Sequence, residues 1–226
     1  MEENARMKRY SLSGLLGGIV FMVGDCLLFC YEGAQDKTVE PAWADMAEWR
    51  FVASAVLGFV GMTLMLPAFI AFYKMIAACC GRAARAFASL SFIGVASTGY
   101  LHFALGTLLP VTCKAVLESG GTAALAEQAA LHWADRVKYI DLVLIGFLSI
   151  VYLLHIYVTL SGKSGLKRPM CLVGITGALA AGLLWKVIFG NTAIGGAWCA
   201  CESLGEGLIY LTTYFYWKKQ SADQRA

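Results

Sequence analysis

Six ionisable side chains interrupt long apolar stretches of this sequence, and their types suit cation binding and proton exchange: Asp25, His102, Asp141, Lys186, Glu202 and Glu206. A charged group inside a bilayer costs about 2.5–3.5 kcal/mol on insertion scales, so such groups usually face the protein interior in pairs or around water. Because four acids oppose one lysine, the surplus carboxylates must hold a proton, accept hydrogen bonds or meet a cation. Closely spaced carboxylates in a low dielectric favour protonation of at least one of them, so proton exchange near neutral pH is expected.

The composition is that of a membrane protein. Of the 226 residues, 59% are apolar and 15% are charged, and the mean hydropathy is +0.65. Soluble domains average about 45–50% apolar and about 25% charged residues. These values argue against a soluble enzyme, a disordered tail and a nucleic-acid module, and a net charge of +3 is too small to indicate a polyanionic partner. We expect one integral membrane domain over residues 1–226.

The apolar stretches predict an all-α, polytopic bundle of six transmembrane helices. A helix needs about 20 mostly apolar residues to cross a hydrocarbon core of about 30 Å. The first stretch is too long and glycine-rich for a cleaved signal peptide. Between the third and fourth stretches, residues 122–138 predict a helix on the outer surface capped by Thr122, either an amphipathic decoration or a lid. The six predicted spans are 10–32, 50–73, 88–110, 139–162, 169–190 and 200–217.

The distribution of Lys and Arg predicts that both termini are cytoplasmic. Cytoplasmic loops carry an excess of these residues. Of the 18, twelve fall at the termini and in the second and fourth connections, and only five fall in the other connections. Five of the six tryptophans lie near the predicted outer boundary, which agrees with an interfacial aromatic belt. The five outer basic residues are Lys37, Arg50, Lys114, Arg136 and Lys138.

Counting from the span ends places nearly all the ionisable groups in the outer half of the bilayer, which predicts an outward-facing polar pocket. Lys186 continues a stripe of small residues at four-residue spacing (Gly174, Ala178, Gly182), so it should face neighbouring helices. Structural roles compete with this prediction. Glu48, Arg50 and Asp141 suit interfacial positions, Glu202 and Glu206 suit a solvated helix start, and Asp25 with Lys186 suits a buried ion pair.

The segment Gly24-Asp25-Cys26-Leu27-Leu28-Phe29 resembles a signature of a known family. It is similar to the Gly-Asp-x-Leu-Leu-aromatic motif of a domain-of-unknown-function family of small bacterial multi-pass membrane proteins. The resemblance is strongest over the first span and carries no activity with it. It implies a location in the bacterial cytoplasmic membrane and a role for Asp25.

Other chemistries find little support in the sequence. The three histidines (His102, His132 and His155) form no metal-ligand pattern, so we expect no metal. Phosphate-binding glycine motifs and a nucleophile elbow are absent, and we expect no cofactor. Cys30, Cys113, Cys199 and Cys201 lie near the predicted outer boundary, where they could form structural disulfides or remain apolar thiols.

Three functions remain open, and the sequence does not decide whether the protein is an enzyme. The leading hypothesis is a protein that binds a small cationic or protonatable molecule in the outward pocket, with proton-coupled transport as its use. The first alternative is a membrane-embedded enzyme that acts on a lipid or sterol-like substrate, with a carboxylate and His102 exchanging protons. The second is a non-catalytic partner subunit, in which the stripe of the fifth span would face another chain. Membrane lipid and a small-molecule or lipid ligand are the expected partners, and nucleic acid is not.

Overall fold

The described part of the chain is built from helices joined by turns, which confirms the all-α prediction. The computed structural model describes residues 2–31, 43 and 46–224 and contains no strand within them. Residue 32 of the first predicted span, and Lys37 and Arg225 of the charge count, lie outside the described residues. The elements are α1 (Glu2–Phe29), α2 (Glu48–Cys79), α3 (Arg82–Leu101), η2 (His102–Leu108), α4 (Leu109–Glu118), α5 (Ala123–Leu160), η3 (Arg168–Leu172), α6 (Ile175–Phe189), η4 (Gly195–Ala200) and α7 (Cys201–Asp223).

Four helical segments are long and apolar enough to cross a membrane. They are Glu2–Phe29, Glu48–Cys79, Arg82–Glu118 and Ala123–Leu160. Helix α6 is apolar but has only 15 residues, or about 22 Å at 1.5 Å per residue, which is shorter than a hydrocarbon core. Helix α7 is not among the four, because carboxylates in its first two turns and lysines near its end lower its hydropathy.

The third segment changes its winding in the middle. Its central part, η2, is a π-helix between α3 and α4. Pro110 lies at the start of α4; it has no backbone N–H to donate to the preceding turn, and its ring crowds the carbonyl four residues earlier. The wider π-helical turn relieves this conflict. Such turns occur frequently at functional sites, and this one begins at His102.

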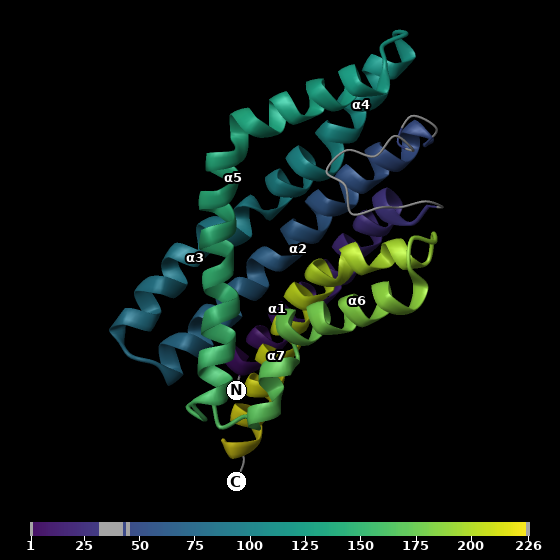
Figure 1. The fold of residues 1–226 in the computed structure, drawn as a ribbon. Helices are drawn as coiled ribbons and strands as arrows, with labels where there is room; N and C mark the ends of the chain where they lie inside the picture. The colour runs from purple at the N-terminus through teal and green to yellow at the C-terminus, as the bar shows by residue number, and fades with distance from the viewer. Residues whose placement is uncertain (1, 32–42, 44–45, 225–226) are drawn as a thin grey trace.

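The predicted surface helix and the fourth predicted span are one continuous helix, α5. The Thr122 side chain accepts a hydrogen bond from the Leu125 N–H at 3.2 Å, so the predicted cap is confirmed. The first part of α5 bends away from the remainder and, together with α4, forms an arm at one end of the molecule (Figure 1). The sequence predicted two helices here because the first part is polar and the second is apolar. In the structure the helix continues without interruption from Ala123 to Leu160.

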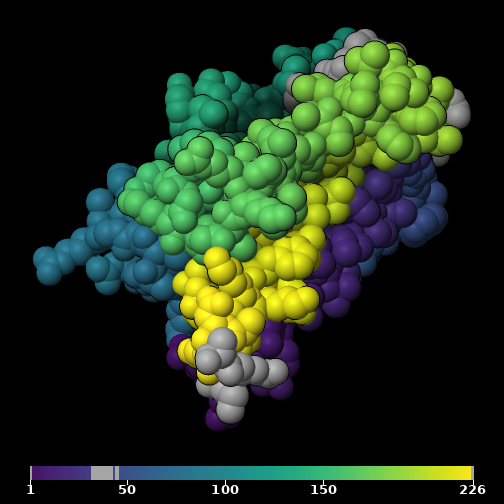
Figure 2. All heavy atoms as spheres, turned by 90° about the horizontal axis from the view of Figure 1, so that it is seen from below, coloured from purple at the N-terminus to yellow at the C-terminus, as the bar shows by residue number. Residues whose placement is uncertain are grey.

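Helix α1 packs closely against both α2 and α7, because glycines bring the backbones together. A Cβ at Gly17 would lie 2.6 Å from the carbonyl oxygen of Gly61 on α2, and a Cβ at Gly18 would lie 2.5 Å from Cα of Gly207 on α7. Figure 2 shows the yellow α7 between the purple α1 and the green α6. In membranes, van der Waals contact between close backbones stabilises helix pairs. These contacts fix the heights of α1 and α7 relative to each other.

Arg50 caps the far end of α1. Its side chain donates hydrogen bonds to the carbonyl oxygens of Leu27 at 2.7 Å and Cys30 at 2.9 Å. The last carbonyls of a helix have no partner within it, and a basic group there also complements the helix dipole. The interfacial position considered for Arg50 therefore has a structural use, which is to hold the end of the helix that carries Asp25.

Both chain termini lie at the same end of the bundle (Figure 1). The Asn4 side chain donates to the Gln224 side chain at 3.1 Å. Lys74 forms an ion pair with Glu3, and Lys219 donates to the carbonyl oxygen of Gly165 at 2.8 Å. The connections that follow α2 and α5 therefore reach the end that holds the termini. We call it the terminal end.

The small-residue stripe of α6 packs inside the chain. A Cβ at Gly174 would lie 3.0 Å from the His155 ring on α5, and a Cβ at Gly182 would lie 2.5 Å from the Cys201 sulfur on α7. Ala178, between them, is buried. The stripe thus faces neighbouring helices as predicted. It does not form an exposed face for another chain, which is what the partner-subunit hypothesis required of it.

Candidate functional site

A cavity of about 290 Å³ lies between α1, the junction of α3 with η2, α5 and α7. Four of the six predicted site residues line it: Asp25, His102, Glu202 and Glu206. The volume is at the lower end of the range for small-molecule pockets, about 300–1,000 Å³. The other lining residues are Phe21, Phe29, Thr98, Leu101, Leu105, Gly106, Ile145, Leu148, Cys199 and Ser203.

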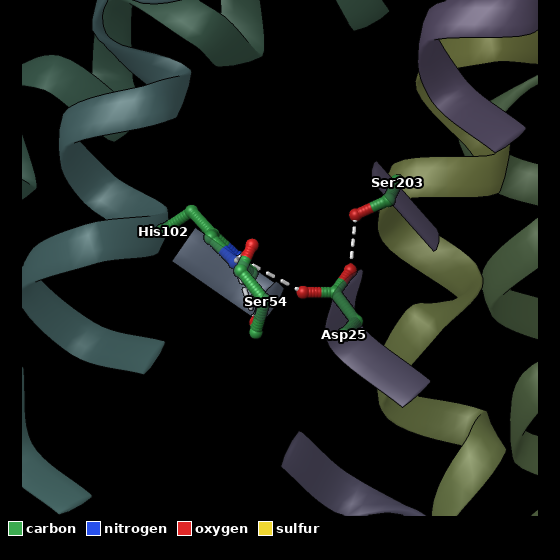
Figure 3. Close-up of polar contacts among 4 residues, drawn as sticks. All are labelled: Asp25, Ser54, His102 and Ser203. Carbon is green, nitrogen blue, oxygen red and sulfur yellow. Dashed lines mark hydrogen bonds and ion pairs between the residues drawn. The ribbon is translucent and has the colours of Figure 1, made fainter. Parts of the chain in front are cut away.

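Asp25 is the centre of a hydrogen-bonded network that joins four helical elements (Figure 3). One carboxylate oxygen, Oδ1, lies 3.1 Å from Nδ1 of His102 in η2. The other, Oδ2, accepts a hydrogen bond from the Ser203 hydroxyl of α7. The Asp25 residue is buried, with 7% of its surface exposed. Both of its oxygens therefore have partners, as a buried carboxylate requires.

The His102 ring can be satisfied in either protonation state. Its Nε2 lies 2.9 Å from the Ser54 hydroxyl and 3.0 Å from the Ser54 carbonyl oxygen. A neutral ring that donates from Nδ1 to Asp25 can accept the Ser54 hydroxyl proton at Nε2. A protonated ring donates from both nitrogens, with the Ser54 carbonyl as acceptor. In either state of the ring, both nitrogens therefore have a hydrogen-bond partner.

The position of the His102 ring depends on a glycine and an aromatic ring. A Cβ at Gly58 of α2 would overlap the imidazole, so only glycine allows this approach. The Phe21 ring also packs against the imidazole, with ring centroids 4.7 Å apart and an interplanar angle of 57°. The π-helical turn that begins at His102 places the residue at the cavity wall. Three separate elements thus hold one side chain in place.

Two further carboxylates on α7 share a phenol from α5. The Tyr152 hydroxyl lies 2.8 Å from Oε1 of Glu206 and 3.4 Å from Oε1 of Glu202. Glu206 is buried, with 6% of its surface exposed. Both glutamates also lie within electrostatic range of Asp25. One hydroxyl proton cannot satisfy all these oxygens, so the group favours an added proton or a cation.

The charge and the apolar surface of the cavity together describe its ligand. Three carboxylates and one imidazole face the cavity, and none of the Lys or Arg residues that the structure describes is among its lining residues. The remaining wall is mostly apolar and includes the rings of Phe21 and Phe29. Aromatic faces attract organic cations, and buried carboxylates need a positive partner. The arrangement suits a small cation or protonated amine that carries an apolar body.

Two predicted site residues do not reach this cavity. Lys186 is half-buried, and its ammonium group lies 5.7 Å from the ring centroid of Trp198 in η4. Asp141 is buried on α5, where its electrostatic neighbour is Tyr100, and its Oδ1 has no hydrogen-bond partner among the described residues. Neither residue lines the cavity. The expected chamber shared by Asp25 and Lys186 is therefore not formed.

Three residues of the network were not predicted as site residues: Ser54, Tyr152 and Ser203. The sequence did contain signals for two of them. Ser54 lies on the small-residue side of its helix with Gly58, and Tyr152 shares a face of α5 with His155. Ser203 is buried one turn before Gly207, the residue that brings α7 against α1. That contact could not be inferred from either helix alone.

The cysteines and the other candidate metal ligands form no second centre in the described residues. All eight cysteines are described, and none is in a disulfide. Cys26 and Cys30 lie one helical turn apart near the end of α1, where Arg50 donates to the Cys30 carbonyl oxygen. No group of three or more His, Cys, Asp or Glu side chains in the described part of the chain is arranged to hold a metal ion.

The Ser54, His102 and Asp25 side chains follow the order of a nucleophile, a base and an orienting acid, but Ser54 is inaccessible. None of its surface is exposed, and it does not line the cavity. We therefore expect Ser54→Ala to cost only about 0.5–1.5 kcal/mol, the net value of one hydrogen bond. Ligand affinity measured by calorimetry should fall less than about tenfold. Complete loss of activity in a folded Ser54→Ala protein would instead assign Ser54 a role as nucleophile.

Comparison with known proteins identifies a family for the chain. The model of a family of unknown function (DUF6796) matches residues 1–220. Because the match covers nearly the whole sequence, the chain belongs to this family. No curated protein and no solved structure matches the chain. The motif in the first helix predicted membership of a family of unknown function, and this match confirms that part of the prediction.

Proposed function

We propose that this member of the DUF6796 family binds a small organic cation or protonatable amine and moves it across a membrane in exchange for protons. The observation that carries the proposal is the cavity: Asp25, Glu202 and Glu206 line it together with apolar side chains, and no Lys or Arg from residues 2–31, 43 and 46–224 is among the lining residues. The negative charge of these carboxylates can be compensated in two ways. Either protons bind to the carboxylates, or an organic cation occupies the cavity.

Exchange follows from competition between these two states. A cation that enters the cavity stabilises the ionised carboxylates, so protons held by Glu202, Glu206 or the Asp25–His102 pair leave. When the cation departs, the closely spaced carboxylates repel one another and recover protons. The Tyr152 hydroxyl, which contacts both glutamates, provides a route for a proton between them. Proton and cation occupancy are thereby mutually exclusive.

The proposal includes six crossings, with both termini in the cytoplasm of a bacterial cell and the cavity opening outward. An even number of crossings is supported by the contact between Asn4 and Gln224, which joins the two ends of the chain. Helix α6 would cross with help from η3, which precedes it. The excess of Lys and Arg in the connections at the terminal end supports a cytoplasmic location for that end.

Proteoliposomes that contain the purified protein and a trapped pH-sensitive dye test this function. The probe is benzyltrimethylammonium, with neutral benzyl alcohol as the comparison. We expect addition of the cation outside to drive protons out of the lumen, so that the trapped dye reports a rise in internal pH, and an imposed pH gradient to drive accumulation of the cation. Benzyl alcohol should do neither. If a series of organic cations neither binds in calorimetry nor moves protons, the proposal is wrong.

A second candidate function is supported by one specific contact. The Asp25–His102 pair, 3.1 Å apart, lies in a mostly apolar wall, and such a pair suits general acid–base chemistry on a lipid or sterol-like molecule. Membrane lipid incubated with purified protein and examined by mass spectrometry distinguishes the two functions. A new product that His102→Gln does not form would favour the enzyme. Neither product nor retained lipid would favour the exchanger.

A further inference from the structure

His155 is a buried histidine with no use in the site described above. None of its surface is exposed, and neither ring nitrogen has a hydrogen-bond partner among the described residues. Removing the partner of a buried polar group costs about 1–3 kcal/mol. A buried polar group without one therefore points to a water, an ion or a functional role. His155 lies one helical turn beyond Tyr152 on α5, toward the terminal end.

The surrounding helices are shaped to hold this imidazole. At Gly174, just before α6, a Cβ would lie 3.0 Å from Cε1 and 3.1 Å from Nδ1 of His155. The same Cβ would lie 3.1 Å from Cγ1 of Ile209 on α7. The ring therefore occupies the place where α5, the start of α6 and α7 meet. Glycine at residue 174 leaves room for it.

A small void lies beside Glu206 and reaches Ile209, the residue that also packs at the Gly174 position. The void is about 10 Å³ and is bordered by Tyr152, Glu206, Ile209 and Tyr210, together with three apolar side chains. A cavity needs about 10–15 Å³ to hold one water molecule. Ile209 borders the void and also approaches the Gly174 position beside the ring. The glutamate, the phenol and the water-sized space thus lie together, and Ile209 is the residue shared by this space and the Gly174 position beside the imidazole.

Polar groups continue beyond His155 toward the terminal end. Thr159 lies one turn after His155 on α5, and Thr212 lies one turn after Ile209 on α7. Both threonines are fully buried. The Thr159 hydroxyl donates to the His155 carbonyl oxygen at 2.7 Å, and the Thr212 hydroxyl donates to the Val173 carbonyl oxygen at 3.0 Å. Their oxygen atoms retain lone pairs that can accept a proton donor. The titratable groups that face this region are Tyr152 on α5 and Glu206 and Tyr210 on α7; Gly174 brings none from the start of α6.

We propose that His155 is the residue that passes protons between the Glu202–Glu206 pair and the terminal side of the protein; this inference rests on the proposed proton exchange. A proton leaves the Glu206 carboxyl group for the Tyr152 oxygen, the Tyr152 hydroxyl proton passes to a water in the void, and that water protonates Nδ1 of His155. The imidazolium then releases a proton to water at the terminal side. A rotamer change of Ile209 opens the step between void and ring.

Two variants of similar volume, His155→Gln and His155→Met, test this role in proteoliposomes. We expect binding of benzyltrimethylammonium to change less than about twofold, because His155 does not line the cavity. Exchange of labelled for unlabelled cation without a pH gradient should also persist, since it requires no net proton transfer. Accumulation driven by a pH gradient should fall at least about tenfold. Thr63→Ala, an exposed site on α2, is the matched control.

The outcomes separate this inference from the function on which it rests. If the wild type neither binds nor exchanges the cation, the proposed function fails and the relay fails with it. If the wild type couples flux to protons and both His155 variants still do, only the relay is wrong. Should the variants not fold, nitrogen NMR of the wild-type histidines decides: the His155 ring must change protonation when the cation is added, and an unchanged ring overturns the relay.

Discussion

Asp25→Asn is expected to raise the Kd for benzyltrimethylammonium at least about tenfold, equivalent to about 1.4 kcal/mol. The change removes a charge from the cavity and leaves the His102 Nδ1 and the Ser203 hydroxyl opposite an amide. One amide oxygen can still accept a hydrogen bond, whereas the amide NH₂ cannot replace the second acceptor. Calorimetric titration of the purified protein, with gel filtration to verify folding, measures the effect.

Asp141→Asn is the matched control for this experiment. It neutralises another buried aspartate, on α5, that does not line the cavity. We expect its Kd to stay within about twofold of the wild type. Lys186→Met should likewise change the Kd little, because the ammonium group lies beside Trp198. Equal losses in the two aspartate variants, together with tighter binding in Lys186→Met, would show that net charge controls binding and would contradict the cavity as the binding site.

The contrast between Asp25 and Lys186 shows what counting along a sequence can predict. Residue number within a helix gives depth, because each residue advances the helix by about 1.5 Å. Depth correctly grouped Asp25, His102, Glu202 and Glu206. It does not specify which neighbour a side chain meets at that depth. Beside Lys186 the neighbour is Trp198, because the chain turns through η4 before α7 begins.

The fold was predicted most accurately where hydropathy alone decides it. The first two long apolar stretches correspond to α1 and α2, with ends that differ by several residues. The π-helix was not predicted, since it follows from a conflict between Pro110 and the helix before it, and hydropathy is insensitive to that conflict. Both parts of α5 were predicted to be helical, over 122–138 and 139–162, but they were assigned to two helices because the polar first part does not meet an apolar-span criterion.

The hydroxyl partners in the network were the hardest part of the site to predict. Ser and Thr in membrane helices usually bond the carbonyl of the preceding turn, as Thr159 does here. A serine that instead meets a carboxylate, such as Ser203, looks identical in sequence. What distinguishes it is the close approach of α1 and α7. That approach depends on glycines from two helices separated by most of the chain.

Gly18→Ala should therefore damage both stability and ligand binding. A Cβ at this position would lie 2.5 Å from Cα and 2.7 Å from N of Gly207, and both are backbone atoms that cannot rotate away. Overpacking of this kind typically costs about 1–3 kcal/mol. Separation of α1 from α7 also draws Asp25 away from Ser203, so the Kd for benzyltrimethylammonium should rise with the loss of stability. Unfolding in mixed detergent micelles and calorimetry measure the two effects.

Gly146→Ala is the control that separates the effect of the α1–α7 contact from the effect of replacing a helical glycine with alanine. Gly146 also lies within a helix, but nothing approaches within 4 Å of a Cβ placed there. Because alanine is favoured over glycine in helices by about 1 kcal/mol, this variant should be as stable as the wild type or more so, with unchanged Kd. The same intrinsic gain is available at Gly18, so a net loss there measures the backbone contact itself. If Gly18→Ala matched Gly146→Ala in both measurements, α1 and α7 would not be in contact at Gly18, and the link from Asp25 to Ser203 would lose its structural basis.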